Sequence, residues 1–330
     1  MKPSKGIATV TLNPAVDQSV TIPGFATGTV NRVAGERSDP GGKGVNVASI
    51  LADLGFRVTV TGLLGRDNAG LFNQLFASKG IGDAFVRVPG STRINVKIID
   101  HRASAVTEIN FPGPATRPQD IAELERRIDA LCTDHDCFVV SGSLPAGLPP
   151  TYYAGLIRRL KVAGKRVLLD SSGEALRHGA GARPWLIKPN LAELEDLLGA
   201  PLPDETSLIG ARHRLRSIGP DGVLVSLGSA GALLVADGEL LRAVPPAVEV
   251  RSTVGAGDAL VAGFVAGELR GWSVADCARF ATACAAAALT RIGPWLPKPA
   301  VIERLMAQVA ITALAEPPER LPAPAGGAAG

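Results

Sequence analysis

Short runs of β-branched and aliphatic residues recur along the chain and predict buried strands. The clearest lie at residues 8–12, 57–64, 137–142, 166–170, 185–190 and 222–228. Between most of them lie segments with helical spacing of apolar residues; residues 118–132 begin with Pro and residues 150–164 end in Gly, as helices often do. This alternation predicts βαβ units, and therefore a mostly parallel sheet with helices on both faces.

Two segments, residues 14–37 and 87–112, break this alternation. They contain short strand-like runs, "QSVTI", "INVKIID" and "VTEINF", without helices between them. We expect a small antiparallel sheet beside the main domain, with a lid over the active site as one interpretation and loose hairpins without a role as the other. The final residues, 313–330, are rich in Pro, Ala and Gly, which predicts a disordered tail.

Composition narrows the class of protein. The chain has 330 residues, 46% hydrophobic but only 4% aromatic, so we expect one large α/β domain with an aliphatic core. A net charge of +3 gives no support for a nucleic-acid surface. No uncharged stretch is long and unbroken enough to span a bilayer. The N-terminus does not resemble a signal peptide.

Cysteine and histidine usage gives no sign of a zinc site. The four cysteines, Cys132, Cys137, Cys277 and Cys284, form no C-x-x-C pair, and the four histidines are scattered. We therefore expect reduced thiols and a cytoplasmic protein. The spacing of Cys277 and Cys284 predicts that both lie on one buried helix face.

Residues 39–55, "DPGGKGVNVASILADLG", are the first candidate site. Gly41 and Gly42 precede a helical pattern, with Lys43 beside them. Backbone N–H groups at a helix start attract anions, and glycine permits close approach of a ligand. The P-loop pattern is absent, and a plain turn is the alternative interpretation.

Residues 251–264, "RSTVGAGDALVAGF", are the second candidate site. Gly255, Ala256 and Gly257 offer N–H donors at a helix start, and Asp258 is a candidate base. Leu260 replaces the third glycine of a dinucleotide-binding motif, so that fold is not favoured. An Asp in a first helical turn is also commonly only a cap or a partner of the helix dipole.

Two further segments favour a nucleotide. In "IKPNLAELEDLLG", Lys188 and Asn190 end a strand and Glu193 follows one turn later; Lys is suited to a phosphate and Glu to Mg²⁺ held through water. A capping box is the alternative. Residues 225–235, "VSLGSAGALLV", predict either a plain hairpin or a loop at the edge of a nucleotide.

In this order, "GGKGVNVA", "KPNLAELE", "VSLGSAGAL" and "STVGAGDALVAGF" closely resemble the signatures of the ribokinase/PfkB family of carbohydrate kinases. The resemblance covers roughly residues 6–312. It implies a ribokinase-like three-layer α/β/α domain, extending over residues 1–312, with a mostly parallel central sheet and a small β-sheet lid that often clasps a partner lid in a homodimer. Within the family, "TLNPAVD", "GSTRINVK" and "SGSLPAG" resemble the branch that acts on phosphorylated ketohexoses.

The resemblance also implies roles for individual residues. Asp258 is the expected base, and Gly255, Ala256 and Gly257 form the anion hole. The expected contacts of the sugar phosphate are Asp17, Gly41, Gly42 and Asn46 for the sugar and Lys43, Arg93 and Ser141 for its phosphate. The expected ATP contacts are Lys188, Asn190, Ser226, Gly228 and Gly231. Glu193 is expected to help place Mg²⁺, and Ser252 and Val254 lie where some members bind a monovalent cation such as K⁺.

The expected reaction is transfer of the γ-phosphoryl group of ATP to fructose 1-phosphate, which gives fructose 1,6-bisphosphate. Fructose 6-phosphate and tagatose 6-phosphate remain alternative substrates. A non-catalytic sugar-phosphate sensor and a nicotinamide- or flavin-dependent oxidoreductase are alternatives of other classes; the intact Asp258, Lys188 and Glu193 count against the sensor.

Overall fold

A computed structural model describes residues 6–103, 105–291, 293 and 295–314. The main sheet has the strand order β15-β14-β13-β12-β11-β10-β9-β1-β4-β5, and β6 pairs with β4. Its parallel strands are β1 (Gly6–Thr11), β4 (Val58–Gly65), β5 (Gly82–Asp83), β6 (Val86–Val88), β9 (His135–Ser141), β10 (Arg166–Asp170), β11 (Leu186–Ile187) and β12 (Gly222–Ser226). An antiparallel extension follows at one edge: β13 (Ala232–Ala236), β14 (Glu239–Val244) and β15 (Ala310–Ala313).

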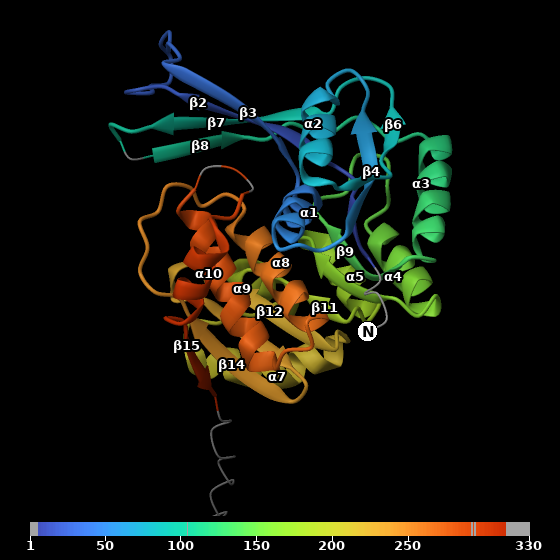
Figure 1. Ribbon diagram of the computed structural model, residues 1–330, viewed down its shortest axis with the longest axis vertical. Helices are drawn as coiled ribbons and strands as arrows, with labels where there is room; N and C mark the ends of the chain where they lie inside the picture. The colour runs from blue at the N-terminus through green and yellow to red at the C-terminus, as the bar shows by residue number, and fades with distance from the viewer. Residues whose placement is uncertain (1–5, 104, 292, 294, 315–330) are drawn as a thin grey trace, which may run out of the picture.

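Helices cover both faces of this sheet, which confirms the predicted three-layer arrangement (Figure 1). One face carries α1 (Lys43–Asp53), α2 (Gly70–Lys79), α8 (Ala256–Leu269), α9 (Val274–Leu289) and α10 (Pro299–Met306). The other carries α3 (Pro118–Leu131), α4 (Tyr152–Val162), α5 (Gly173–Gly181), α6 (Leu191–Leu198) and α7 (Glu205–Ile218). Both cores are largely aliphatic, and Cys277 and Cys284 are fully buried on α9, as their spacing predicts.

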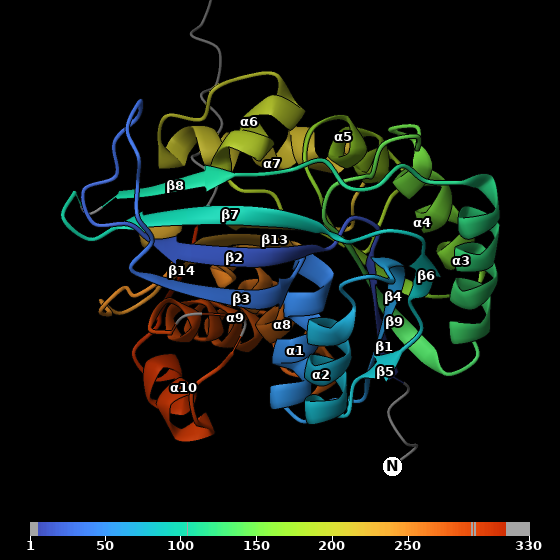
Figure 2. The ribbon, with the colours of Figure 1, turned by 90° about the horizontal axis from the view of Figure 1, so that it is seen from above.

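A separate four-stranded sheet lies beside the carboxyl ends of the parallel strands. Its order is β3 (Gly35–Gly41), β2 (Ala15–Thr21), β7 (Arg93–Asp100) and β8 (Ala105–Ile109), and Figure 2 shows these strands side by side. The expectation of an antiparallel sheet is wrong for its central pair, because β2 and β7 run parallel, with Ala15 opposite Arg93. The reason is that β2 follows β1 and β7 follows β6, so both leave the main sheet at the same edge and in the same direction.

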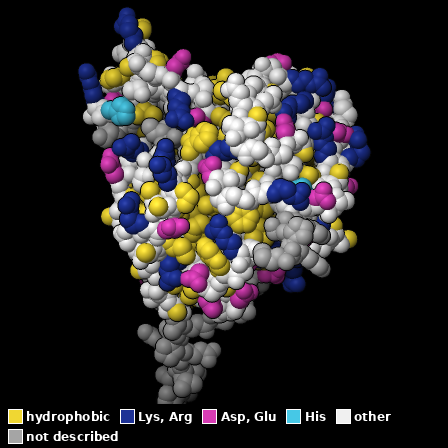
Figure 3. All heavy atoms as spheres, in the orientation of Figure 1, with side chains coloured by type: hydrophobic (Ala, Val, Ile, Leu, Met, Phe, Trp, Pro, Cys, Tyr) yellow, Lys and Arg dark blue, Asp and Glu magenta, His cyan; other side chains and the backbone are white. Residues whose placement is uncertain are grey.

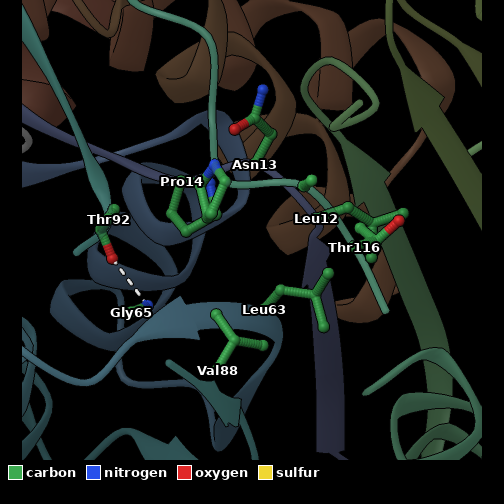
Figure 4. A pocket seen from close by; sticks show the side chains of 10 residues that line it. Leu12, Asn13, Pro14, Leu63, Gly65, Val88, Thr92 and Thr116 are labelled. Carbon is green, nitrogen blue, oxygen red and sulfur yellow. Dashed lines mark hydrogen bonds between the residues drawn. The ribbon is translucent and has the colours of Figure 1, made fainter. Parts of the chain in front are cut away.

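The small sheet joins the main domain where β2 begins after β1 and β7 begins after β6; we call this region the root of the small sheet. A cavity of about 10 Å³, too small for a ligand, lies here among Leu12, Leu63 and Val88 (Figure 4). Beside it, the backbone N–H of Gly65 donates a 2.9 Å hydrogen bond to Oγ1 of Thr92. A Cβ atom on Gly65 would lie 2.2 Å from the backbone nitrogen of Thr92, so the close approach of the two segments requires glycine.

In the described part of the chain, no helix has the length and apolar character needed to cross a bilayer. On the face drawn in Figure 3, basic and acidic side chains are interspersed rather than separated by sign. The tail predicted from residue 313 overlaps the end of β15 at Ala313, and its residues 315–330 lie outside the described residues.

Candidate active site

A cleft lies between the small sheet and the carboxyl edge of the main sheet, where open α/β sheets bind their ligands. Its larger part has a volume of about 500 Å³. An adjoining part of about 340 Å³ reaches the segment before α8. The two parts share Asp17, Asn46, Lys97, Glu108, Thr253 and Val254. The cleft therefore has one wall from the small sheet and one from the main domain.

Asp258 lies in the first turn of α8 and is only 7% exposed. Its Oδ2 accepts a 2.7 Å hydrogen bond from the side-chain amide of Asn46 on α1. Burial and the nearby charge of Asp170 raise the pKa of Asp258 to about 6, although the Asn46 hydrogen bond and the two lysines Lys43 and Lys188 oppose the shift. A carboxyl group with this pKa is well matched to proton abstraction near neutral pH.

The residues before Asp258 form an anion-attracting turn. Gly255 has φ of 82° and caps α8, which begins at Ala256. The first N–H groups of a helix have no partner within the helix and carry its positive end. A Cβ atom on Gly257 would lie 3.7 Å from Nζ of Lys188. The helix start and the Lys188 ammonium group therefore face one location, which suits a developing negative charge.

Lys43 and Lys188 meet at a carboxylate that the sequence motifs did not reveal. Asp170 ends β10 and is 0% exposed. Its Oδ1 lies 2.8 Å from Nζ of Lys43 and 3.4 Å from Nζ of Lys188. Burial disfavours the charged form of Lys43, but the ion pair with Asp170 outweighs it and raises the pKa of Lys43 to about 12. Lys43 is therefore a permanent cation on the cleft wall.

The glycines before Lys43 bring the backbone close to the small sheet. Gly42 has φ of 110° and precedes α1. A Cβ atom on Gly41 would lie 2.5 Å from Oδ2 of Asp17, so a side chain there would displace the Asp17 carboxylate. The predicted sugar contacts Asp17, Gly42 and Asn46 all line the cleft together with Lys43; Gly41 lies directly behind Asp17.

Arg93 also lines the cleft, at the root of the small sheet. Its guanidinium donates hydrogen bonds to the backbone oxygens of Asn13 (3.0 Å), Phe111 (3.0 Å) and Pro14 (3.3 Å). Burial lowers the pKa of Arg93 and Asp17 opposes this shift. Arg93 therefore joins the segments that enter and leave the small sheet, a connection that its sequence position did not predict.

The predicted nucleotide residues lie at the ends of β11 and β12. Lys188 is 4% exposed, while Asn190 and Ser226 form an isolated parallel bridge. Asn190 and Glu193 form a capping box at the start of α6: Oδ1 of Asn190 accepts a bond from the Glu193 N–H, and Oε2 of Glu193 accepts one from the Asn190 N–H. The capping interpretation is thus confirmed, and Glu193 still lines the cleft.

The hairpin predicted over residues 225–235 is confirmed by the antiparallel pair β12–β13, joined by the 3-10 turn η1 (Gly228–Ala230). Gly231 has φ of +90°, and a Cβ atom there would lie 2.0 Å from the backbone oxygen of Ala243. Gly228 has φ of +60° with open space around its missing Cβ. Gly231 is thus required by packing, whereas Gly228 leaves room for a ligand.

Among the remaining predicted residues, Ser141 is buried, whereas Ser252 and Val254 line the cleft. Ser141 is 0% exposed, and a Cβ atom on Gly44 of α1 would lie 2.9 Å from its Oγ. The helix packs over Ser141, and the cleft is lined by Gly142 and Ser143 instead. Ser252 and Val254, the predicted cation residues, line the smaller part of the cleft.

Several residues that line the cleft were not predicted. They are Asn13, Asn95, Lys97, Glu108, Asn110, Ser143, Ser171 and Ser172. Among them, Nζ of Lys97 lies 3.4 Å from Oδ2 of Asp17, which adds a cation to the wall formed by the small sheet. The alternation of "INVKIID" contained the signal for Asn95 and Lys97, because alternate residues of a strand share one face.

The donor set is compatible with a magnesium nucleotide. Mg²⁺ prefers oxygen ligands and usually keeps several waters beside substrate phosphates. The carboxylates of Glu193 and Asp170 are oxygen donors near the two lysines, and Oδ2 of Asp170 has no hydrogen-bond partner among the described residues. The described ranges contain no cluster of three or more metal-ligating side chains. The site therefore fits an ion that arrives with nucleotide phosphates better than one held by protein alone.

A buried carboxylate beside a helix start and two lysines, at the edge of a parallel α/β sheet, is the arrangement expected of a phosphotransferase of the ribokinase-like class. The model of the pfkB family of carbohydrate kinases matches residues 3–300. The chain belongs to this family. It is therefore a sugar kinase, and family membership implies the use of ATP and Mg²⁺.

Curated relatives match nearly the whole chain. The 1-phosphofructokinase of Rhodobacter capsulatus is 48% identical over 93% of this chain and 98% of its own length. That of Escherichia coli K12 is 42% identical with the same coverage. The structure of phosphofructokinase-2 from Escherichia coli with substrates and products is 29% identical, has a TM-score of 0.85 and covers 92% of this chain and 99% of that one. The same enzyme is known in complex with potassium and in a tetrameric inhibited form.

Proposed function

We propose that this protein phosphorylates fructose 1-phosphate with MgATP and releases fructose 1,6-bisphosphate and ADP. The observation that carries the proposal is the buried Asp258 beside the Gly255–Gly257 turn, in a chain 48% identical to a 1-phosphofructokinase. The identity to phosphofructokinase-2 is 29%, so fructose 1-phosphate is favoured over fructose 6-phosphate. Tagatose 6-phosphate is the remaining competitor.

Asp258 accepts the proton of the sugar hydroxyl as its oxygen attacks the γ-phosphorus of ATP. The oxygen–phosphorus bond to ADP breaks as the new one forms, and the proton stays on Asp258. The N–H groups of Gly255, Ala256 and Gly257 stabilise the charge on the transferred group. Phosphoryl transfer needs little covalent help from a protein, so positioning and charge stabilisation supply most of the acceleration.

Cations surround the places where phosphates are needed. We assign the phosphate of the sugar to Lys43 and Arg93, which come from the two walls of the cleft. We assign the ATP phosphates to Lys188, with Asn190, Ser226 and Gly228 beside the nucleotide. Glu193 would help to hold Mg²⁺, which would neutralise charge on the ATP phosphates. The planar guanidinium group of Arg binds phosphate in a fixed orientation, whereas the ammonium group of Lys is a compact charge that can be approached from several directions.

The segment Ser252–Val254 is assigned to a monovalent cation. Val254 donates its N–H to Oγ of Ser252 at 3.2 Å, which turns the chain just before the Gly255 cap. This turn directly precedes the anion hole, so a bound K⁺ would orient it. The potassium complex of phosphofructokinase-2 supports this assignment. A rise in kcat when K⁺ replaces the larger tetramethylammonium ion is the expected result.

We propose that the small sheet is a lid that pairs with the lid of a second copy. Its cleft face carries Asp17, Lys97 and Glu108 beside Ile99 and Val106, whereas its outer face is more apolar. The outer face carries Val20, Val96, Ile98 and Ile109, of which Ile109 is 45% exposed. Ile94, on the same outer face, is 43% exposed. Exposed apolar side chains on a sheet that also has open edge strands favour association with another protein chain. Light scattering of the double variant Ile94→Ser with Ile109→Ser should show monomers, while Val162→Ser, at a site 91% exposed on α4, should keep the wild-type mass.

We also infer a cytoplasmic location. All four cysteines are free thiols, three of them buried, which is typical of a reducing compartment. ATP and phosphorylated sugars are available in the same compartment.

An ADP-release assay across fructose 1-phosphate, fructose 6-phosphate, tagatose 6-phosphate, ribose and adenosine tests the substrate. Fructose 1-phosphate should have the highest kcat/KM. If another ketohexose phosphate exceeds it tenfold, about 1.4 kcal/mol of transition-state stabilisation, the substrate is wrong although the kinase class stands. Absence of ADP release with every sugar would instead support a non-catalytic sensor.

A further inference from the structure

Asp170 connects two lysines that come from different parts of the fold. Lys43 begins α1, directly after a strand of the small sheet, and Lys188 follows β11 on the nucleotide side. Oδ1 of Asp170 is within 2.8 Å of one ammonium group and 3.4 Å of the other. One carboxylate therefore joins Lys43, which lines the cleft, to Lys188, which the proposed function assigns to the nucleotide.

The backbone of Asp170 is paired within the main sheet. It is the last residue of β10, between β9 and β11, and lies opposite Ser141 in the parallel register. Its backbone oxygen accepts a 2.9 Å hydrogen bond from the N–H of Gly142. Its side chain is 0% exposed, so water cannot compensate its charge. A buried carboxylate needs ionic partners to remain ionised, and the two lysines supply them.

We propose that Asp170 is a positioning residue, which fixes the ammonium groups of Lys43 and Lys188 at the point where the phosphoryl group crosses from nucleotide to sugar. The proposal rests on the two ion pairs. An effect of Asp170 on the pH dependence of kcat is a consequence that also depends on the proposed role of Asp258 as the base.

The polar and charged groups that act on Asp258 come from α1, the end of β10 and the segment after β11. Asn46 and Lys43 face it from α1, Asp170 from the end of β10, and Lys188 from the segment after β11; Glu193 of α6 acts on Lys43. Burial is the largest cause of the raised pKa of Asp258, and the negative charge of Asp170 is the second. Removing the charge of Asp170 should therefore make Asp258 ionise at lower pH.

The variant Asp170→Asn tests the proposal, with kcat measured between pH 5 and pH 9 at saturating substrates. We expect a loss in kcat of about 10²-fold, because displacement of a positioned group by about 1 Å has this effect. The acid limb of the kcat profile should also move to lower pH. The matched control is Asp120→Asn on α3, where a carboxylate that is 6% exposed pairs with Arg117; its kcat and acid limb should match the wild type.

A double-mutant cycle with Lys188→Met gives a readout that does not depend on Asp258. If Asp170 acts through Lys188, the fold-loss in kcat of the double variant should be much smaller than the product of the fold-losses of the two single variants. A double variant whose fold-loss equals that product would overturn the positioning role. An Asp170→Asn enzyme with unchanged kcat would also overturn it.

Two further measurements separate the alternatives. If added Mg²⁺ restores Asp170→Asn to wild-type kcat with the acid limb in place, Asp170 holds the metal rather than the lysines, and the proposal is wrong. If Asp170→Asn does not fold, as judged by circular dichroism, Asp170→Glu keeps the charge and moves it by one methylene. We then expect at least a tenfold loss in kcat, and a fully active Asp170→Glu would overturn the proposal. Retained turnover in Asp258→Asn would contradict the assigned base and leave the lysine cycle as an independent test.

Discussion

Asn46 donates a 2.7 Å hydrogen bond to Oδ2 of Asp258, across 212 residues of sequence. Asn46 is 6% exposed and Asp258 7% exposed, so this contact is made in a nearly water-free location. A hydrogen bond to the charged form of a carboxyl group favours ionisation. Asn46 therefore has two effects: it fixes the orientation of the carboxylate, and it lowers a pKa that burial raises.

Asn46→Leu should move the acid limb of the kcat profile to higher pH. The substitution removes the hydrogen bond that lowers the pKa of Asp258, so a larger fraction of the base is protonated below neutral pH. Maximal kcat should also fall, because the carboxylate loses its orientation. Steady-state ADP release from pH 5 to pH 9 measures both effects. A limb that stays in place or moves to lower pH would show that Asn46 does not act on the base.

Asp258→Asn should reduce turnover by about 10²–10⁴-fold, the usual effect of losing a general base, while MgATP binding stays close to normal. Calorimetric titration with ATP separates binding from chemistry. Activity above about half that of the wild type would remove Asp258 from the mechanism.

The same variant should be more stable than the wild type at pH 8. The pKa of Asp258 is raised from 3.8 to about 6 in the folded protein. Its contribution to stability is therefore fully present below pH 3.8 and is lost as pH rises through about 6. The difference is worth about 2–3 kcal/mol, and Asn does not undergo this loss. Urea unfolding at pH 5 and pH 8 should show an advantage of Asp258→Asn that grows with pH; a constant difference would contradict the raised pKa.

Arg93→Ala should raise KM for fructose 1-phosphate and narrow discrimination between this substrate and plain fructose. If Arg93 binds the sugar phosphate, the loss is about 2–5 kcal/mol for a well-desolvated pair, and it affects only the phosphorylated substrate. Loss of its bonds to Asn13, Pro14 and Phe111 would instead reduce kcat/KM for both sugars alike. The ratio of the two kcat/KM values decides between these roles, and an unchanged ratio would exclude the phosphate contact.

Gly231→Ala should lower the free energy of unfolding more than Gly228→Ala. A Cβ atom at Gly231 meets the oxygen of Ala243 at 2.0 Å, whereas one at Gly228 has nothing within 4 Å. Both positions have positive φ, and Gly231 also has ψ of −131°, which lies outside the left-handed helical region that other residues occasionally adopt. The backbone and the steric contact therefore both disfavour Ala more at Gly231. Urea unfolding of the two variants measures this combined difference, and equal losses would contradict it.

Local patterns predicted the parts of the site that depend on one segment. The turn at Gly255–Gly257 with Asp258 behind it, and the glycines before Lys43, lie at helix starts as their motifs indicate. The βαβ alternation also placed these motifs at one edge of the sheet. These features depend on residue spacing within about ten positions, which a sequence displays directly.

Other features depend on contacts between distant segments. Asp170 ends the run "RVLLD" like any acid at the end of a strand, and only the packing of α1 and the segment after β11 brings two lysines to it. The burial of Ser141 depends on Gly44 of the overlying helix. Likewise, nothing within residues 14–37 or 87–112 specifies that two of their strands pair in parallel.

That parallel pair has a consequence for how the molecule folds. β2 and β7 belong to two separate excursions of the chain, with α1, β4 and α2 between them. Neither excursion contains the other's pairing partner, so the central ladder of the small sheet joins only after the intervening elements have brought Ala15 opposite Arg93. Contacts of such high sequence separation form late, because loop closure must precede them. In a refolding experiment followed by pulsed hydrogen exchange, the amides of β2 and β7 should therefore gain protection after those of β1 and β4. The second wall of the cleft is therefore completed only after β1 and β4 have paired.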